Sequence, residues 1–300
     1  LYVEPRGDLI QPRTGKPQPP APLDGDIVDP DSEMDRRDAL AEWLVAPENP
    51  YFARSITNRV WAAFFGKGIV EPVDDLRASN PASNEPLLAA LSDHLVKNKF
   101  DLKSIMRVIL ESETYQRSSE ALPENEKDER QFSHYYPRRM MAEVLHDAIA
   151  DVTKAPAMFK KIKLNDGSTA DTKHYKDGAR ALELYDSAVD SYFLKTFGRN
   201  DRDIACECER SNQPSMVQVL HLSNGDTLNK KLSQKESIVE TLMSEKDVTD
   251  ESIITAAYMA CLSREPEKRE LDGFRVIFKQ TPELEKRTAV EDLFWALMTS

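Results

Sequence analysis

The sequence lacks long apolar runs, and none reaches the roughly 18 residues that a membrane-spanning helix requires. Cysteine is scarce, with 3 residues in the chain, and an odd number of cysteines gives no disulfide framework. Basic residues are in deficit, because 40 Lys and Arg face 52 Asp and Glu and leave a formal net charge of −12. Nucleic-acid-binding domains usually present a basic face. We therefore predict no membrane span, no disulfide scaffold and no nucleic-acid partner.

The familiar short motifs of catalysis and cofactor binding are also missing. The chain contains no Gly-x-Ser-x-Gly, no phosphate-binding glycine loop and no His-Glu-x-x-His. It has no Cys-x-x-Cys redox motif and no Cys-x-x-Cys-His for covalent haem. We therefore predict no cofactor in this chain, and electron transfer has no haem-ligation motif to support it.

What the sequence does contain is the composition of a globular protein. Hydrophobic residues make up 40% of the chain and charged residues 31%, which is unlike a disordered sequence. The chain opens at Leu1 without a methionine or a signal-peptide pattern. We expect it to be part of a longer polypeptide, whose other domains are its first partners.

Helical periodicity dominates the chain and predicts a mainly α fold. Residues 1–33 are instead rich in proline and glycine, and this predicts an extended N-terminal strap lying over the surface. We divide the rest into a helical part (34–153), an irregular segment (154–213) and a second helical part (214–300). All four parts are expected to form one compact, irregular multi-helical domain with long loops. A short strand over 179–185 is at most a minor β element.

Local signals predict several element boundaries. Asn84 is a suitable N-cap with Pro86 in the first helical turn, and Asp101 precedes another apolar-periodic segment. Residues 119–131 are polar and acidic and predict an exposed loop, while residues 165–167 (Asn-Asp-Gly) are a turn signal. After residue 213 we expect helices over 214–224, 235–244, 250–263, 267–280 and 283–299.

The stretch "NRVWAAFFGKGIVEPVDDL", residues 58–76, carries the first candidate polar group. Phe52, Ile56, Val60 and Phe64 repeat every four residues and predict the apolar stripe of this helix. Helical spacing then places Asn58 on its polar side and Arg59 at the edge of its apolar face. A partly desolvated guanidinium needs a partner, and Asp74 and Asp75 follow after a short turn. The structural interpretation is an arginine–aspartate clamp. The functional interpretation is an acidic pair that binds a cation or activates water.

A second polar cluster lies on the helix predicted after Pro137. Glu143 and Asp147 are four residues apart on one side of that helix, where like charges repel. Arg139, one turn before Glu143, is the simplest compensating charge. Other sources are Arg59, Arg210 or a metal, and solvation of the two carboxylates explains the pattern equally well.

Together these groups form a candidate polar centre. Its members are Arg59, Asp74, Asp75, Arg138, Arg139, Glu143, Asp147 and Arg210.

Cys206-Glu207-Cys208 is the least usual short string in the sequence. Zinc sites commonly use Cys-x₂₋₄-Cys, so Cys206 and Cys208 are weak metal candidates and we predict no metal. We expect free or partner-linked thiols first, a local disulfide second and a metal last. Cys261 is expected in the core. His221 lies in a segment that is apolar all round and is expected to be a buried, hydrogen-bonded histidine.

The order of the long motifs is distinctive. Residues 40–76 read "LAEWLVAPENPYFARSITNRVWAAFFGKGIVEPVDDL", residues 135–149 "YYPRRMMAEVLHDAI" and residues 206–225 "CECERSNQPSMVQVLHLSNG". The chain resembles, over nearly its whole length, the planctomycete-type domain of unknown function 1553 family. The positions that match the family's motifs are Asn58, Arg59, Trp61, Phe65, Gly66, Asp74, Asp75, Arg138, Arg139, Glu143, Asp147, Arg210 and Pro214. The chain departs from the family pattern at Cys206 and Cys208, where one cysteine is expected, and at His146, where an arginine is frequent.

The resemblance implies a context more than a reaction. Members of the family look like C-terminal modules of large exported bacterial proteins that also carry cytochrome-c-like domains. This implies an exported protein, periplasmic or at the cell surface, with carbohydrate or cell-envelope components as further candidate partners. Our first hypothesis is a non-catalytic structural or ligand-presenting module. The alternative is a hydrolase or carbohydrate-active enzyme that uses the Asp/Glu/Arg polar centre, and this requires those side chains to converge in an open pocket.

Overall fold

The computed structural model describes residues 9–29, 35–164, 166–200, 214–224, 226–246 and 248–299. The fold is mainly helical, with 49% helix and two small two-stranded sheets in the part described, as predicted from the sequence. Among the described residues, no helix combines the length and the apolar character that crossing a membrane would take.

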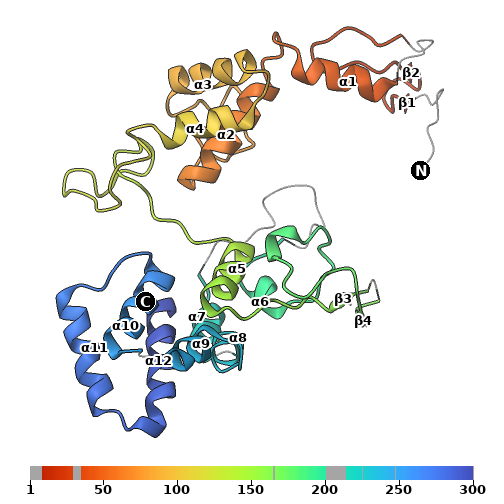
Figure 1. Ribbon diagram of the computed structural model, residues 1–300. Helices are drawn as coiled ribbons and strands as arrows, with labels where there is room; N and C mark the ends of the chain where they lie inside the picture. The colour runs from red at the N-terminus through yellow and green to blue at the C-terminus, as the bar shows by residue number, and fades with distance from the viewer. Residues whose placement is uncertain are drawn as a thin grey trace. The chain divides into compact units, whose positions relative to one another are not determined.

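The chain divides into two compact units, Leu1–Arg138 and Arg139–Ser300. The boundary falls between two adjacent arginines, just before the helix that carries Glu143 and Asp147. It therefore lies inside the stretch 34–153 that we predicted as one helical part. The four-part division itself stays a prediction, and the two units are described separately below (Figure 1).

The described part of the first unit contains a short antiparallel hairpin and four helices (Figure 1). In the hairpin, β1 (Leu9–Ile10) pairs with β2 (Pro17–Gln18). The helices are α1 (Arg36–Val45), α2 (Phe52–Phe65), α3 (Glu85–Lys97) and α4 (Leu102–Leu110).

Helix boundaries in the first unit follow the predicted caps. The Asn84 side chain accepts the amide of Leu87 at the start of α3, with Pro86 in the first turn. The Asp101 carboxylate accepts the amide of Lys103 at the start of α4. Gly66 ends α2 in the left-handed region at φ 77°, which a glycine adopts without strain.

The core of the first unit is aromatic. Trp61 and Phe65 stack with ring centroids 4.1 Å apart, and Phe132 meets both rings edge-on. Leu88 and Leu95 of α3 are fully buried against this cluster. Burying this much apolar and aromatic surface is the main stabilisation available to the unit.

The described part of the predicted strap, residues 9–29, has an exposed apolar surface of its own. Leu9 and Ile27 keep 72% and 64% of their surface in contact with solvent. The segment is tied to α2 by a hydrogen bond from the Tyr51 hydroxyl to the Asp24 carboxylate.

The second unit contains the remaining elements. Its helices are α5 (Ala142–Thr153), α6 (Tyr192–Thr196), α7 (Met216–Asn224), α8 (Asp226–Leu232), α9 (Ile238–Ser244), α10 (Asp250–Leu262), α11 (Lys268–Gln280) and α12 (Lys286–Thr299). The described residues of this unit also form the 3₁₀ helices η1 (Ala181–Glu183) and η3 (Glu283–Glu285) and an antiparallel pair, β3 (Lys161–Lys163) and β4 (Thr169–Asp171).

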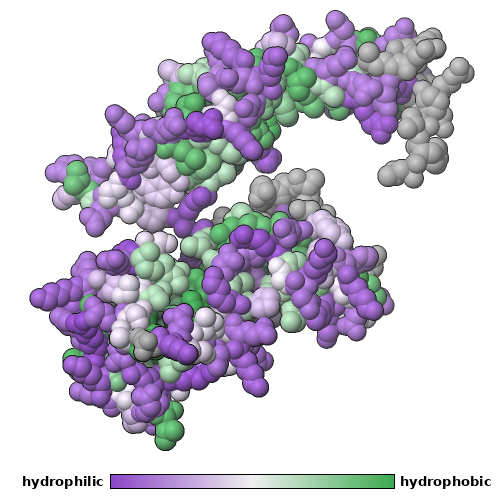
Figure 2. Space-filling view, viewed as in Figure 1, coloured by the Kyte–Doolittle hydropathy of each residue, from purple (hydrophilic) through white to green (hydrophobic). Residues whose placement is uncertain are grey.

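Two hydrophobic clusters stabilise the second unit. One lies around α10 and α12, where Ile254 and Phe294 are fully buried. The other surrounds α5 and includes Phe159, Phe193 and Leu194. Hydrophobic side chains also reach the surface among hydrophilic ones in both units (Figure 2). The most exposed on α7 are Met216, Val217, Val219 and Leu220, so part of this segment, which is apolar all round, faces solvent.

The predicted helices after residue 213 are confirmed to within a turn of their ends, and residues 119–131 form no helix or strand, as expected. The short strand predicted over 179–185 is wrong, because residues 181–183 form η1 instead. The sheet of this region lies at β3 and β4, on either side of the predicted turn, where Gly167 adopts φ 84°. The short helices α6 and α8 were not predicted.

Candidate functional site

The loop after α2 is organised by Asn58, which has no exposed surface. Its side-chain amide donates to the carbonyl oxygens of Val70 at 2.9 Å and Val73 at 2.8 Å. Its side-chain oxygen accepts the amide of Val70 at 2.9 Å. Both N–H donors of the Asn58 side chain and one of the two acceptor positions on its oxygen are therefore bonded to the loop.

The predicted orientation of α2 is wrong by one residue. We expected Phe52, Ile56, Val60 and Phe64 to define the buried stripe, whereas the buried residues are Ala53, Thr57, Asn58, Trp61 and Phe65. One residue corresponds to about 100° of rotation. The rotation places the large rings of Trp61 and Phe65 in the core and turns Asn58 inward and Arg59 outward.

The predicted arginine–aspartate clamp is present, but it lies at the surface. Arg59 Nη2 is 2.7 Å from Asp74 Oδ1, and the two side chains keep 42% and 46% of their surface exposed. Asp75 pairs with Arg77 instead, at 2.6 Å from Nε, and this guanidinium lowers the pKa of the Asp75 carboxyl. The two adjacent carboxylates thus have separate cationic partners, as structural ion pairs do.

Arg138 and Arg139 have different tasks although they are adjacent. The Arg138 guanidinium donates to the carbonyl oxygen of Ala63 in the last turn of α2. Arg139 Nη1 donates to Gln218 Oε1 at 3.1 Å, and Gln218 in turn donates to the carbonyl oxygen of Thr196 at 3.0 Å. Arg139 therefore fixes α7 rather than the carboxylates of α5.

Glu143 and Asp147 are both buried, so their predicted solvation is wrong. Among the described residues, the ion-pair partner of Glu143 is Arg199 at 3.8 Å, and not Arg139, which was the simplest of the alternatives offered by the sequence. Arg199 also donates to the carbonyl oxygen of Asp186 at 3.0 Å.

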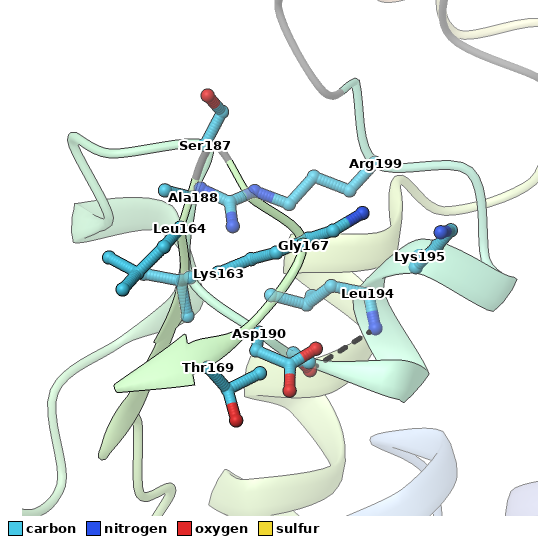
Figure 3. Close-up of a pocket in the computed structure, with 12 residues that line it drawn as sticks. Lys163, Leu164, Gly167, Thr169, Ser187, Ala188, Asp190, Leu194, Lys195 and Arg199 are labelled. Carbon is cyan, nitrogen blue, oxygen red and sulfur yellow. Dashed lines mark hydrogen bonds between the residues drawn. The ribbon is translucent and has the colours of Figure 1, made fainter. Parts of the chain in front are cut away.

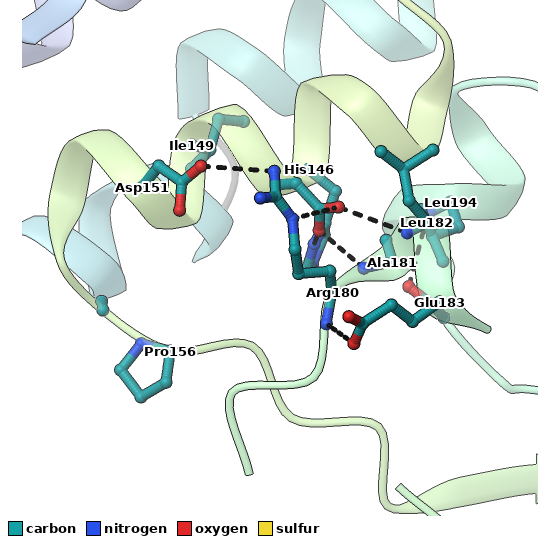
Figure 4. Close-up of polar contacts among 12 residues, drawn as sticks. His146, Ile149, Asp151, Pro156, Arg180, Ala181, Leu182, Glu183 and Leu194 are labelled. Carbon is teal, nitrogen blue, oxygen red and sulfur yellow. Dashed lines mark hydrogen bonds and ion pairs between the residues drawn. The ribbon is translucent and has the colours of Figure 1, made fainter. Parts of the chain in front are cut away.

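Both carboxylate oxygens of Asp147 accept hydrogen bonds from the segment around η1. One oxygen accepts the amide of Ala181 at 2.6 Å, and the other accepts the amide of Leu182 at 3.2 Å and lies 3.5 Å from Arg180 Nε. Figure 4 shows Arg180, Ala181 and Leu182 in this arrangement beside α5. A carboxylate at the N-terminus of η1 satisfies amides that have no partner within the helix. Asp147 thus holds η1 against α5.

Two buried titratable groups near Asp147 were not predicted as site residues, although His146 was noted as a departure from the family pattern. His146 packs between the rings of Phe159 and Phe193, and its Nδ1 is 3.8 Å from Asp147 Oδ1. Burial lowers the pKa of His146, and the positive charge of Lys231 acts in the same direction. Lys231 Nζ donates to the carbonyl oxygen of Ala155 at 2.6 Å, and burial lowers the pKa of this lysine too.

The cysteine candidates are only partly within reach of the structure. Cys206, Cys208 and Arg210 lie outside the described residues. Cys261 is half-buried against the α10–α12 core, and burial raises the pKa of its thiol to about 11. His221 donates to or accepts from the Thr227 hydroxyl at 2.9 Å. In the described stretches of the chain, no group of three or more His, Cys, Asp or Glu side chains could hold a metal ion.

A cleft with a volume of about 570 Å³ lies in another part of the second unit. Its charged lining residues are Lys163, Asp190, Lys195 and Arg199 (Figure 3). The cleft could not be predicted because its walls come from β3, β4, α6 and the segment between them.

These features define a mainly helical protein whose candidate polar residues are distributed over two units and engaged in structural contacts. The chain belongs to the family described as "Protein of unknown function (DUF1553)", whose model matches residues 36–277. No curated protein and no solved structure was found to match the chain.

Proposed function

We propose that this chain is a non-catalytic module of an exported multidomain bacterial protein, in which it serves assembly or ligand presentation. The observation that carries the proposal is the bonding of Asp147, whose two carboxylate oxygens are occupied by two backbone amides and a guanidinium. A carboxylate that acts as a general base or nucleophile must keep an oxygen available to substrate.

The other candidate residues support the same conclusion. Asp74 and Asp75 each pair with an arginine of the first unit, and within the second unit Glu143 pairs with Arg199. The alternative hydrolase hypothesis requires convergence in one open pocket. A structural role requires each group to satisfy a neighbour, and this is the pattern of the contacts described above.

The non-catalytic role can be tested with the whole chain and with two variants of α5. We expect no turnover above the buffer rate of nitrophenyl glycosides, esters and phosphates by the wild-type protein. Glu143→Gln and Asp147→Asn should change the melting temperature instead. Turnover that is lost in a Glu143→Gln variant with an unchanged circular dichroism spectrum would establish the hydrolase alternative.

The exported, multidomain context needs a separate measurement. An antibody raised against this chain should detect, in fractionated source cells, a polypeptide well above the chain's own 34.1 kDa, in the periplasmic or cell-surface fraction. Detection only at 34.1 kDa in the cytoplasmic fraction would contradict this part of the proposal.

A further inference from the structure

The 570 Å³ cleft of the second unit has preformed walls. The β3–β4 pair is extended by the segment 187–191, because the Lys163 amide donates to the carbonyl oxygen of Ala188 at 2.7 Å. The Asp190 amide donates to the carbonyl oxygen of Lys161 at 2.9 Å. Val189 and Leu194, which also line the cleft, are buried in the α5 cluster. The volume is within the range of about 300–1,000 Å³ that small-molecule sites occupy.

The charge of this cleft is opposite to that of the protein. Lys163 and Lys195 line it with two positive charges against the single carboxylate of Asp190, while Arg199 is paired with Glu143, in a chain with a formal net charge of −12. Among the described residues, neither lysine forms an ion pair. Figure 3 shows Lys163 extending across the cleft from β3 toward the side where α6 carries Lys195. Placing like charges in one concave site is unfavourable unless an anion compensates them.

The neutral groups of the lining indicate what else the ligand carries. Thr169, Ser187 and Ser191 contribute hydroxyl groups, and Asp190 contributes an acceptor for ligand hydroxyls. Arg199 is held in place by the Glu143 carboxylate at 3.8 Å and by the carbonyl oxygen of Asp186 at 3.0 Å. A fixed guanidinium with two mobile ammonium groups suits an oxyanion, and the hydroxyl groups suit a polyol.

We propose that this cleft binds an anionic polyol, that is, a sugar-like molecule that carries a carboxylate or a phosphate. Lys163 and Lys195 contact the oxyanion, while Asp190, Thr169 and Ser191 contact the hydroxyl groups. The inference rests on the ligand-presenting part of the proposed function and supplies the chemical class of that ligand. The structural role of Asp147 does not depend on it.

Calorimetric titration of the whole chain at low ionic strength tests the proposal with four probes: glucuronate, glucose 6-phosphate, inorganic phosphate and glucose. We expect saturable binding of glucuronate or glucose 6-phosphate, and none of glucose. Binding of glucuronate alone identifies a carboxylated ligand, and binding of glucose 6-phosphate alone a phosphorylated one. Lys163→Gln and Lys195→Gln should each weaken binding about tenfold, as expected for the loss of a charge-assisted hydrogen bond.

Lys160→Gln is the matched control, because Lys160 pairs with Asp177 at 3.4 Å and does not line the cleft. It should leave the dissociation constant unchanged. The substituted lysines are exposed, so the three variants are expected to retain the wild-type circular dichroism spectrum. The proposal is overturned if neither sugar anion binds, if inorganic phosphate binds as tightly as both, or if the Lys163→Gln, Lys195→Gln double variant binds like wild type. These outcomes are measured by binding, whereas the non-catalytic role is tested by turnover, so a failure of one proposal can be told apart from a failure of the other.

Discussion

Asn58 and Val70 form a reciprocal pair in which the asparagine side chain imitates a strand neighbour. The side-chain Nδ2 of Asn58 donates to the carbonyl oxygen of Val70 at 2.9 Å, and the backbone amide of Val70 donates to Asn58 Oδ1 at 2.9 Å. The loop passes so close that a Cβ on Gly68 would lie 2.9 Å from both polar atoms of the Asn58 side chain and 2.2 Å from the carbonyl oxygen of Val70. The loop after α2 is therefore built around one buried side chain.

Asn58→Ala is expected to destabilise the first unit by about 2–4 kcal/mol, because it leaves buried backbone groups of the loop without partners. Arg59→Ala is the adjacent control. Its ion pair with Asp74 is nearly half exposed, so we expect a loss of no more than about 1 kcal/mol. Urea denaturation followed by tryptophan fluorescence measures both, since Trp61 lies in the same core. Equal losses in the two variants would refute the assigned roles.

The contrast between these neighbours shows what the sequence could reveal. Caps are local, so Asn84 and Asp101 predicted the starts of α3 and α4 correctly. The orientation of α2 depends on which aromatic side chains the rest of the unit can enclose, and the four-residue repeat from Phe52 to Phe64 was not enough to decide it. Inward-facing Asn58 could have been suspected only from the glycine-flanked loop that follows it.

Asp147→Asn is expected to destabilise the second unit by about 2–3 kcal/mol, because an amide group then faces backbone donors that a carboxylate oxygen now accepts. Asp151→Asn is the matched control on the same helix. Asp151 also meets Arg180, at 3.4 Å, but its side chain is 70% exposed, and its loss should cost less than about 1 kcal/mol. Thermal unfolding by circular dichroism compares the two. An unaffected Asp147→Asn variant would show that η1 does not depend on this carboxylate.

The partners of the α5 carboxylates illustrate why the candidate site was only partly predictable. The Arg59–Asp74 pair was correctly predicted from residues fifteen positions apart within one motif. Arg180 and Arg199 reach Asp147 and Glu143 from an irregular segment with little periodicity. Spacing on one helix shows that two like charges need compensation, but it does not show which distant side chain supplies it.

Stability should fall on mild acidification because of His146. Burial places the folded-state pKa of His146 below its ordinary value of 6.5, so the unfolded chain binds the proton more readily. The contribution of His146 is fully present above pH 6.5 and is lost progressively as the pH falls from there toward the lowered folded-state pKa. Lys231 and Asp147 are the charged groups nearest to it. Melting temperatures across this range should fall less in His146→Gln than in wild type, and parallel curves would refute the assignment.

The Cys261 thiol should resist labelling while the protein is folded. Burial raises its pKa to about 11, so at pH 8 only about one thiol in a thousand is ionised, against roughly a quarter for an ordinary thiol. In a Cys206→Ser, Cys208→Ser double variant we therefore expect reaction with a thiol-specific disulfide reagent to be about a hundredfold slower in the folded state than in guanidinium chloride. The unfolded sample should release one equivalent, which confirms that the thiol is present and reduced. Rapid labelling of the folded double variant would show that Cys261 is accessible.

In the wild-type protein, two further equivalents that react without denaturant would confirm free thiols at Cys206 and Cys208. Stoichiometric zinc lost on their substitution would reverse the predicted order.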